Sequence, residues 1–206
     1  MSELKVCKLQ SFMGNAKAYA YSSPDMVCEE IGIIANDGDW EVFSDGKIEY
    51  RRRATIIRDA FYKIENKWTV VADESVDMYP TLYFNSLDRF TKVLIPGKNG
   101  ENLQTALPTY DGEPIYVKAE DLKYPGMTIS ICGMQTQGVF TDVPGSACYF
   151  RKSWEGKARH WCLFPRMTLA PGQSYEGNAY LSLSAPSMDH PGPEEVFARA
   201  EEILNA

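Results

Sequence analysis

Hydrophobic and polar residues alternate with a period of two along much of the chain. In residues 47–57 the apolar side chains fall on one face of an extended segment and most of the charged ones on the other. This pattern is typical of a strand with one buried and one solvated face. Asp45 and Gly46 precede the segment, and an Asp-Gly pair favours a tight turn, so residues 40–57 are predicted to form a β-hairpin. Similar alternation recurs around residues 68–72, 127–132, 159–164 and 178–183.

Pro-Gly pairs separate these alternating segments. They occur at residues 96–97, 125–126, 144–145, 171–172 and 191–192. Proline sets the φ angle of the second turn residue, and glycine takes the positive φ that follows. Many short strands joined by such turns are typical of an antiparallel sandwich or barrel. Because strands do not alternate with helices, we predict an all-β fold: an antiparallel β-sandwich over residues 1–190.

Residues 191–206 carry the pattern of a C-terminal helix. Pro193 suits a first helical position, and Glu194 and Glu195 suit the positive end of the helix dipole. One apolar stripe follows, made of Val196, Phe197, Ala200, Ile203 and Leu204. The stripe must be buried, either against the sandwich or in another domain or chain. The helix is therefore either part of the sandwich or a linker to a following domain.

Composition and charge exclude several classes of protein. The chain has 206 residues, of which 44% are hydrophobic and 24% charged, and suits one medium globular domain or two small ones. Its 28 acidic and 21 basic residues give a net charge of -7, which disfavours nucleic acid as a partner. No signal peptide and no apolar run of about 20 residues occurs, so we expect a cytoplasmic protein that does not bind membranes.

The sequence carries no motif for a metal, a cofactor or a catalytic nucleophile. The five cysteines are scattered without a C-x-x-C motif, and the two histidines lack ligand spacing. His160 is either a core or wall histidine or a general base. With Glu155 or Asp142, it would supply the acid and base of a stand-alone sugar isomerase. Carboxylate pairing across a glycosidic bond cannot be read from sequence, so no catalytic residue is assigned.

Two segments carry candidate binding chemistry. Residues 154–161 place two indoles, an arginine and a histidine around one turn, and indole faces stack on sugar rings unless they are taken up by core packing. The irregular segment 96–125 contributes two amides, and long loops are often functional. The predicted ligand-binding set is Asn99, Asn102, Trp154, Arg159, His160 and Trp161.

The only basic run is Arg51, Arg52 and Arg53. On a strand, Arg51 and Arg53 share one face, where they either bind a carboxylate or phosphate group or form cross-strand ion pairs on a solvated sheet. Arg52 falls on the apolar face.

Four further segments, taken in order, are similar to a known family: residues 48–53, 93–102, 138–144 and 164–175. Their order resembles the N-terminal β-super-sandwich domain of glycoside hydrolase-like carbohydrate-active enzymes, in which a two-sheet sandwich precedes an (α/α) toroid. The helix at residues 193–204 resembles the linker into the toroid, so the resemblance spans residues 40–204.

The resemblance implies a function without catalysis. In such enzymes the catalytic carboxylates lie largely in the toroid, which this chain lacks. The resemblance therefore implies a non-catalytic β-sandwich module that binds a carbohydrate or supports its processing. Two alternatives stay open: a structural or assembly protein that docks through its C-terminal helix, and a stand-alone mutarotase-like isomerase.

Overall fold

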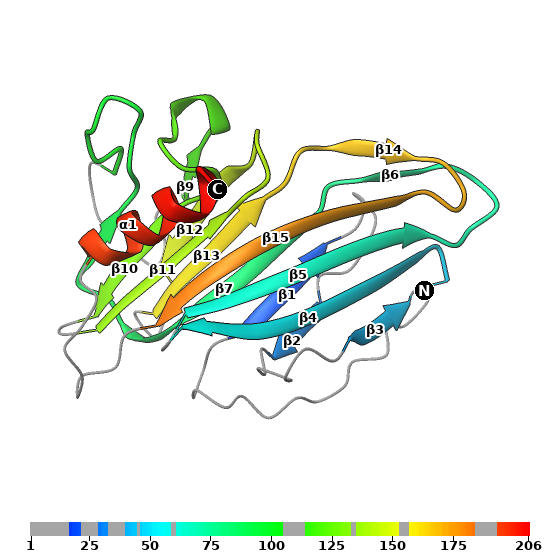
Figure 1. The fold of residues 1–206 in the computed structure, drawn as a ribbon, viewed down its shortest axis with the longest axis horizontal. Coiled ribbons are helices and arrows are strands. Elements are labelled where there is room, and N and C mark those ends of the chain that lie inside the picture. Colours follow the sequence, from blue (N-terminus) through cyan, green and yellow to red (C-terminus); the bar gives the residue numbers. More distant parts are fainter. Residues whose placement is uncertain are drawn as a thin grey trace.

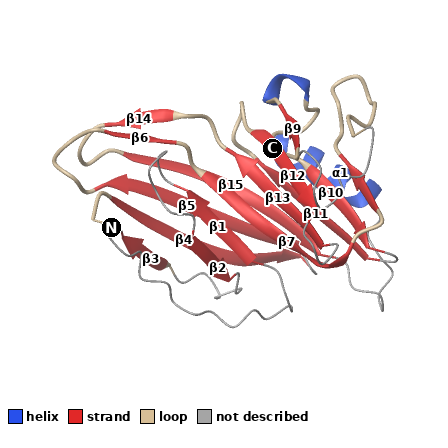
Figure 2. Cartoon of the chain, turned by 180° about the vertical axis from the view of Figure 1, so that it is seen from behind, coloured by secondary structure: helices blue, strands red, loops and turns tan. Residues whose placement is uncertain are grey.

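The computed structural model describes residues 17–21, 29–32, 40–44, 46–58, 61–104, 114–132, 135–152, 157–183 and 193–206. Every described strand pairs antiparallel with its neighbours, in two large sheets and one small ribbon (Figures 1 and 2). The predicted fold class, an antiparallel β-sandwich with one C-terminal helix, is confirmed.

The six-stranded sheet has the order β2-β1-β7-β13-β12-β9. Its strands are β2 (Glu29–Gly32), β1 (Lys17–Tyr21), β7 (Thr81–Arg89), β13 (Lys157–Leu163), β12 (Ala147–Lys152) and β9 (Ile115–Val117).

The seven-stranded sheet has the order β3-β4-β5-β15-β11-β10-β8. Its strands are β3 (Glu41–Ser44), β4 (Ile48–Arg58), β5 (Phe61–Val70), β15 (Ser174–Leu183), β11 (Gln135–Thr141), β10 (Thr128–Cys132) and β8 (Lys92–Leu94). The ribbon joins β14 (Met167–Leu169) to β6 (Val76–Met78), and a short 3-10 helix, η1, covers Ala119–Asp121.

The main core lies between the two large sheets. Trp68 on β5 is fully buried there, stacked on Tyr50 at 5.2 Å and perpendicular to Phe164 at 5.6 Å. Ile48 and Ala54 on β4 point into the same core, as their alternation predicts. Burying these large side chains is the main force that holds the sheets face to face.

The helix α1 (Pro193–Leu204) lies across the other face of the seven-stranded sheet, near β10 and β11 (Figure 1). Val196 and Ala200 of the predicted stripe are fully buried against Phe140 and its neighbours. Gly138 allows this close approach, because a Cβ atom there would lie 2.5 Å from Val196 Cγ1. The helix thus covers the part of the outer face of this sheet around β10 and β11. No helix in the described part of the chain is long and apolar enough to cross a membrane.

Candidate functional site

A cavity of about 310 Å³ lies between α1 and the loops that precede it in sequence. We call it the helix cleft. One wall comes from the loop after β8, one from the turn before β10, and one from α1. Its lining residues are Leu94, Pro96, Gly100, Glu101, Asn102, Lys123, Tyr124, Phe197 and Glu201.

Backbone hydrogen bonds fix the loop wall of the helix cleft. The amide of Gly97 donates to the carbonyl of Glu101 at 2.8 Å, and Gly100 takes a φ of 86°, which favours glycine. The side chain of Asn102 accepts from the Ile95 amide at 2.8 Å and donates to the Val93 carbonyl at 3.3 Å. Asn102, a predicted ligand residue, therefore lines the cleft, while its amide group also holds the loop in place.

The helix wall combines an aromatic pair with a carboxylate. Phe197 stacks on Tyr124 with ring centroids 5.9 Å apart and planes 17° apart. Glu201 follows Phe197 by one turn, and the Tyr124 hydroxyl donates to its Oε1 at 2.8 Å. The aromatic pair therefore packs α1 onto the turn before β10 and places a carboxylate at the edge of the cleft.

Three neighbouring groups in the cleft shift one another's protonation. Lys123 Nζ lies 3.2 Å from Glu201 Oε1 and 4.9 Å from the centre of the Tyr124 ring. The hydroxyl of Tyr124 and the carboxylate of Glu201 raise the pKa of Lys123. The same hydroxyl, with Lys123, lowers the pKa of Glu201, whereas burial raises the pKa of Tyr124. Lys123 and Glu201 are therefore both charged at neutral pH.

Among the described residues, none of the other predicted binding residues lines the helix cleft. Arg159 and Trp161 are half-buried on the outer face of the six-stranded sheet, where the ring of Trp161 meets Tyr149 at 4.6 Å and 90°. Asn99 is exposed in the loop beside Asn102 but does not line the cleft. Trp154 lies outside the described residues. The structure thus separates Asn99 and Asn102, in the loop after β8, from Arg159 and Trp161 on the six-stranded sheet.

His160 lies between the two sheets. Its Nδ1 is 2.6 Å from Thr128 Oγ1, and its Nε2 is 3.1 Å from Ser130 Oγ on β10. The imidazole is fully buried, and burial lowers the pKa of His160 to about 3. A neutral ring has one donor and one acceptor nitrogen, which matches two hydroxyl partners. His160 therefore joins the sheets as a neutral core residue.

Neither proposed acid–base partner of His160 is placed beside it. Glu155 lies outside the described residues. The Asp142 carboxylate is hydrogen-bonded to Asn178 and Tyr180, which lie on the outer face of the seven-stranded sheet.

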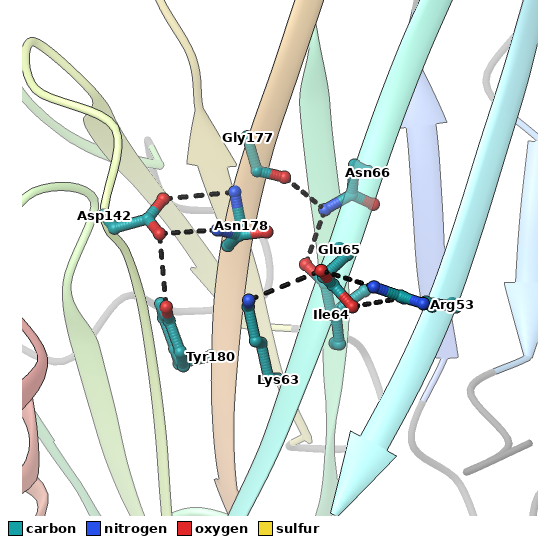
Figure 3. Close-up of polar contacts among 9 residues, drawn as sticks. All are labelled: Arg53, Lys63, Ile64, Glu65, Asn66, Asp142, Gly177, Asn178 and Tyr180. Carbon is teal, nitrogen blue, oxygen red and sulfur yellow. Dashed lines mark hydrogen bonds and ion pairs between the residues drawn. The ribbon is translucent and has the colours of Figure 1, made fainter. Parts of the chain in front are cut away.

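A second polar group of residues begins at Tyr180, which packs beside Phe140 under α1, and extends over the part of this outer face that α1 leaves bare. We call it the polar lattice, and Figure 3 shows its members with their hydrogen bonds. Asp142 accepts from the Asn178 amide at 3.1 Å, from its Nδ2 at 2.7 Å and from the Tyr180 hydroxyl at 3.1 Å. The polar lattice consists of Arg53, Lys63, Glu65, Asp142, Asn178 and Tyr180.

Glu65 is the second carboxylate of the polar lattice. Arg53 donates to both of its oxygens, once through Nε and once through Nη2 at 3.0 Å, and Lys63 Nζ lies 3.4 Å away. Arg51 donates through Nε to one oxygen of Glu49, Oε1, at 2.7 Å. The arginine run thus forms ion pairs on a sheet face, and Arg52 is buried on the inner side.

The loop and turn walls of the helix cleft fall in the irregular segment 96–125, which the sequence marks as a candidate functional loop, but no pattern within it singles out Glu101, Lys123 or Tyr124. Phe197 belongs to the predicted apolar stripe, and Glu201 follows it at i+4, which places both on one side of the helix. That spacing was the available signal. Among the described residues, no group of three or more His, Cys, Asp and Glu side chains could hold a metal ion.

Comparison with known proteins gives similarity in structure only. No protein-family model and no curated protein matches the chain. Among solved structures, a polysaccharide lyase is similar with a TM-score of 0.49 and 15% identity over 92% of this chain, which spans only 27% of the lyase. A galactose mutarotase-related enzyme from Lactobacillus acidophilus is similar with a TM-score of 0.48 and 11% identity. The match covers 88% of this chain and 84% of the enzyme.

A third similar structure is a protein from Synechocystis, with a TM-score of 0.43 and 12% identity over 88% of this chain and 65% of that one. Two of the three similar structures are therefore carbohydrate-related enzymes. At these scores the similarity carries no argument about the activity of this chain.

Proposed function

We propose that the protein binds a carbohydrate in the helix cleft and does not transform it. The observation that carries the proposal is the make-up of the cleft. Leu94, Pro96 and Phe197 offer apolar surface, while Glu101, Lys123 and Glu201 supply polar groups. A sugar ring has apolar faces and a hydroxyl rim, and binding sites for such ligands combine apolar walls with a few convergent polar groups.

The size of the cleft limits the ligand. Its volume of about 310 Å³ lies at the lower end of the range of about 300–1,000 Å³ for ligand pockets. A terminal or single sugar unit suits this space better than a long internal stretch of glycan. The proposal therefore predicts weak binding with a preference for short oligosaccharides.

The protonation of the cleft supports binding without catalysis. A general acid that works near neutral pH needs a raised carboxyl pKa, but Tyr124 and Lys123 lower the pKa of Glu201. His160, the candidate acid of the mutarotase-like alternative, is enclosed between the sheets. The docking alternative relies on the apolar stripe of α1, but Val196 and Ala200 of that stripe are already buried within this chain.

The test is a glycan screen of the whole chain followed by titration calorimetry with the best short oligosaccharide. Phe197→Ala removes the ring that lines the cleft, and Phe197→Leu keeps apolar packing but removes the flat face. We expect both variants to bind about tenfold more weakly, which corresponds to a loss of about 1.4 kcal/mol in binding free energy.

Trp161→Ala is the matched control, because it removes a half-buried aromatic side chain from the opposite outer face. We expect its affinity to be unchanged. Loss of binding in Trp161→Ala alone would move the site to the six-stranded sheet. A folded protein that binds no glycan would overturn the proposal.

A further inference from the structure

The charges of the helix cleft are not balanced. Glu101 on the loop wall and Glu201 on the helix wall supply two carboxylates, whereas Lys123 is the one cation among the lining residues. Lys98 lies in the same loop, but it does not line the cleft. The chain as a whole carries a net charge of -7, which has the same sign as the net charge of the cleft lining.

The ammonium group of Lys123 already occupies a cation site inside the cleft. It lies over the ring of Tyr124 at 4.9 Å and beside the Glu201 carboxylate at 3.2 Å. A ring face and a carboxylate are the two kinds of partner that attract an ammonium group. The Lys123 side chain is 45% exposed and flexible, so a competing ammonium group can take its place at little cost.

Glu101 supplies a second carboxylate that its neighbours leave available. Its Oε1 lies against Gly97, where a Cβ atom would come within 2.6 Å of it. Hydrogen bonds of the loop backbone hold the residue in place, with the carbonyl of Glu101 accepting from Gly97 at 2.8 Å. Among the residues that the structure describes, none pairs with this carboxylate. The wall of the cleft therefore contains an acceptor for a positively charged donor.

We infer that the helix cleft prefers a sugar that carries a free amino group over its neutral, N-acetylated and acidic counterparts. The inference rests on the proposed function and names the ligand class for the same site. The protonated amine lies between Glu101 and Glu201, and the sugar ring lies against Phe197. An acidic sugar is disfavoured because it brings a third negative charge into the cleft.

The experiment compares four trisaccharides by titration calorimetry with the whole chain: glucosamine, N-acetylglucosamine, glucose and galacturonic acid trimers. The pH is kept below the pKa of the sugar amine. We expect the glucosamine trimer to bind at least about fivefold more tightly than the glucose trimer, and the galacturonic acid trimer to bind most weakly.

Two carboxylate variants test the role of Glu101. Glu101→Gln keeps the shape of the side chain, and we expect it to abolish the preference for the amine, so that the glucosamine trimer binds no more tightly than the glucose trimer. Glu120→Gln is the matched control, because this glutamate is exposed, pairs with Lys118 at 3.6 Å and does not line the cleft. We expect it to bind all four trimers as the wild type does.

The outcomes separate the two proposals. Equal binding of glucosamine and glucose trimers, or a preference that survives in Glu101→Gln, overturns the amine inference and leaves carbohydrate binding standing. No binding of any trimer at millimolar concentration overturns the proposed function, and the amine inference fails with it. A preference that disappears equally in Glu120→Gln reflects the overall charge of the chain and also overturns the inference.

Discussion

The helix cleft and the polar lattice belong to the same outer face of one sheet, yet they use charge in opposite ways. In the lattice, each carboxylate is bound by several donors of its own neighbours: Asp142 by Asn178 and Tyr180, and Glu65 by Arg53 and Lys63. In the cleft, the chain leaves a volume of about 310 Å³ and a carboxylate, Glu101, with no partner among the described residues. Polar residues that hydrogen-bond to one another stabilise the fold, whereas polar residues that line a cavity can bind a ligand.

The helix causes the difference. Where α1 covers β11, the outer position at Phe140 carries an apolar side chain, and the one at Gly138 carries no side chain. Where the sheet is bare, outer positions on adjacent strands lie directly opposite each other and can pair, as Glu65 does with Arg53 in the register of β4 and β5. The cleft forms at the edge of the helix, where neither apolar packing under α1 nor cross-strand pairing fills the space.

The largest effect is expected from displacing the helix. Gly138→Val places methyl groups where Val196 already lies, since even a Cβ atom would meet Val196 Cγ1 at 2.5 Å. We expect a loss of about 3 kcal/mol in the free energy of unfolding, together with loss of ligand binding in the cleft. Urea denaturation and calorimetry measure the two effects.

A valine on the bare part of the sheet is the control for this change. Ser174→Val introduces the same side chain at an exposed position of β15 and removes only an exposed hydrogen bond to Thr69, so we expect a loss of no more than about 1 kcal/mol. Equal destabilisation by the two substitutions would show that the helix does not depend on Gly138.

A smaller loss of stability is expected from the polar lattice. Asp142→Ala removes the acceptor of three hydrogen bonds and leaves the donors of Asn178 and Tyr180 without it. We expect a loss of about 2 kcal/mol in the free energy of unfolding, with unchanged affinity in the cleft at temperatures where the protein is folded. Asp77→Ala is the comparison, because Asp77 is exposed and its carboxylate accepts from Thr168 on the ribbon. We expect it to lower the free energy of unfolding less than Asp142→Ala does. If Asp142→Ala also weakened binding, the two regions would not be independent.

The sequence predicted the features that depend on local periodicity. Alternation placed Ile48, Tyr50 and Ala54 on the buried face of β4, and the stripe placed Val196 and Ala200 under α1. Each of these predictions needs only the geometry of one strand or one helix. Burial of one face is a strong constraint, because a shift of one residue would expose the whole apolar set.

The helix cleft could not be predicted in the same way. Its walls come from residues 94–102, 123–124 and 197–201, which are brought together only by sheet order and helix docking. Asn102 was predicted from its residue type, but its amide turned out to bind the backbone of its own loop. His160 stood next to Trp161 in sequence, and strand alternation sends the two side chains to opposite faces.

A pH effect of modest size is expected in the polar lattice. Hydrogen bonds from Arg53 lower the pKa of Glu65 below its ordinary value of 4.5. The folded state therefore binds this proton less readily than the unfolded state, and the resulting stability is complete above the unfolded pKa and lost as the pH falls through the folded pKa. We expect wild type to exceed Glu65→Gln in Tm by on the order of 1–2 °C at pH 7, and the difference to shrink on acidification. Parallel curves of Tm against pH would contradict the pairing.

The smallest effect is expected on the pKa of Glu201, which two neighbouring side chains in the helix cleft lower. The Tyr124 hydroxyl is the main cause of the lowered pKa of Glu201, and Lys123 is the second. Tyr124→Phe keeps the ring that stacks on Phe197 but removes the donor, whereas Lys123→Met keeps an apolar stem but removes the cation. We expect an NMR titration to show a rise in the pKa of Glu201 in both variants, larger in Tyr124→Phe. The opposite order would mean that the ion pair controls this carboxylate, and the pKa of Glu201 would then rise with added salt, because exposed ion pairs are screened more strongly than a hydrogen bond.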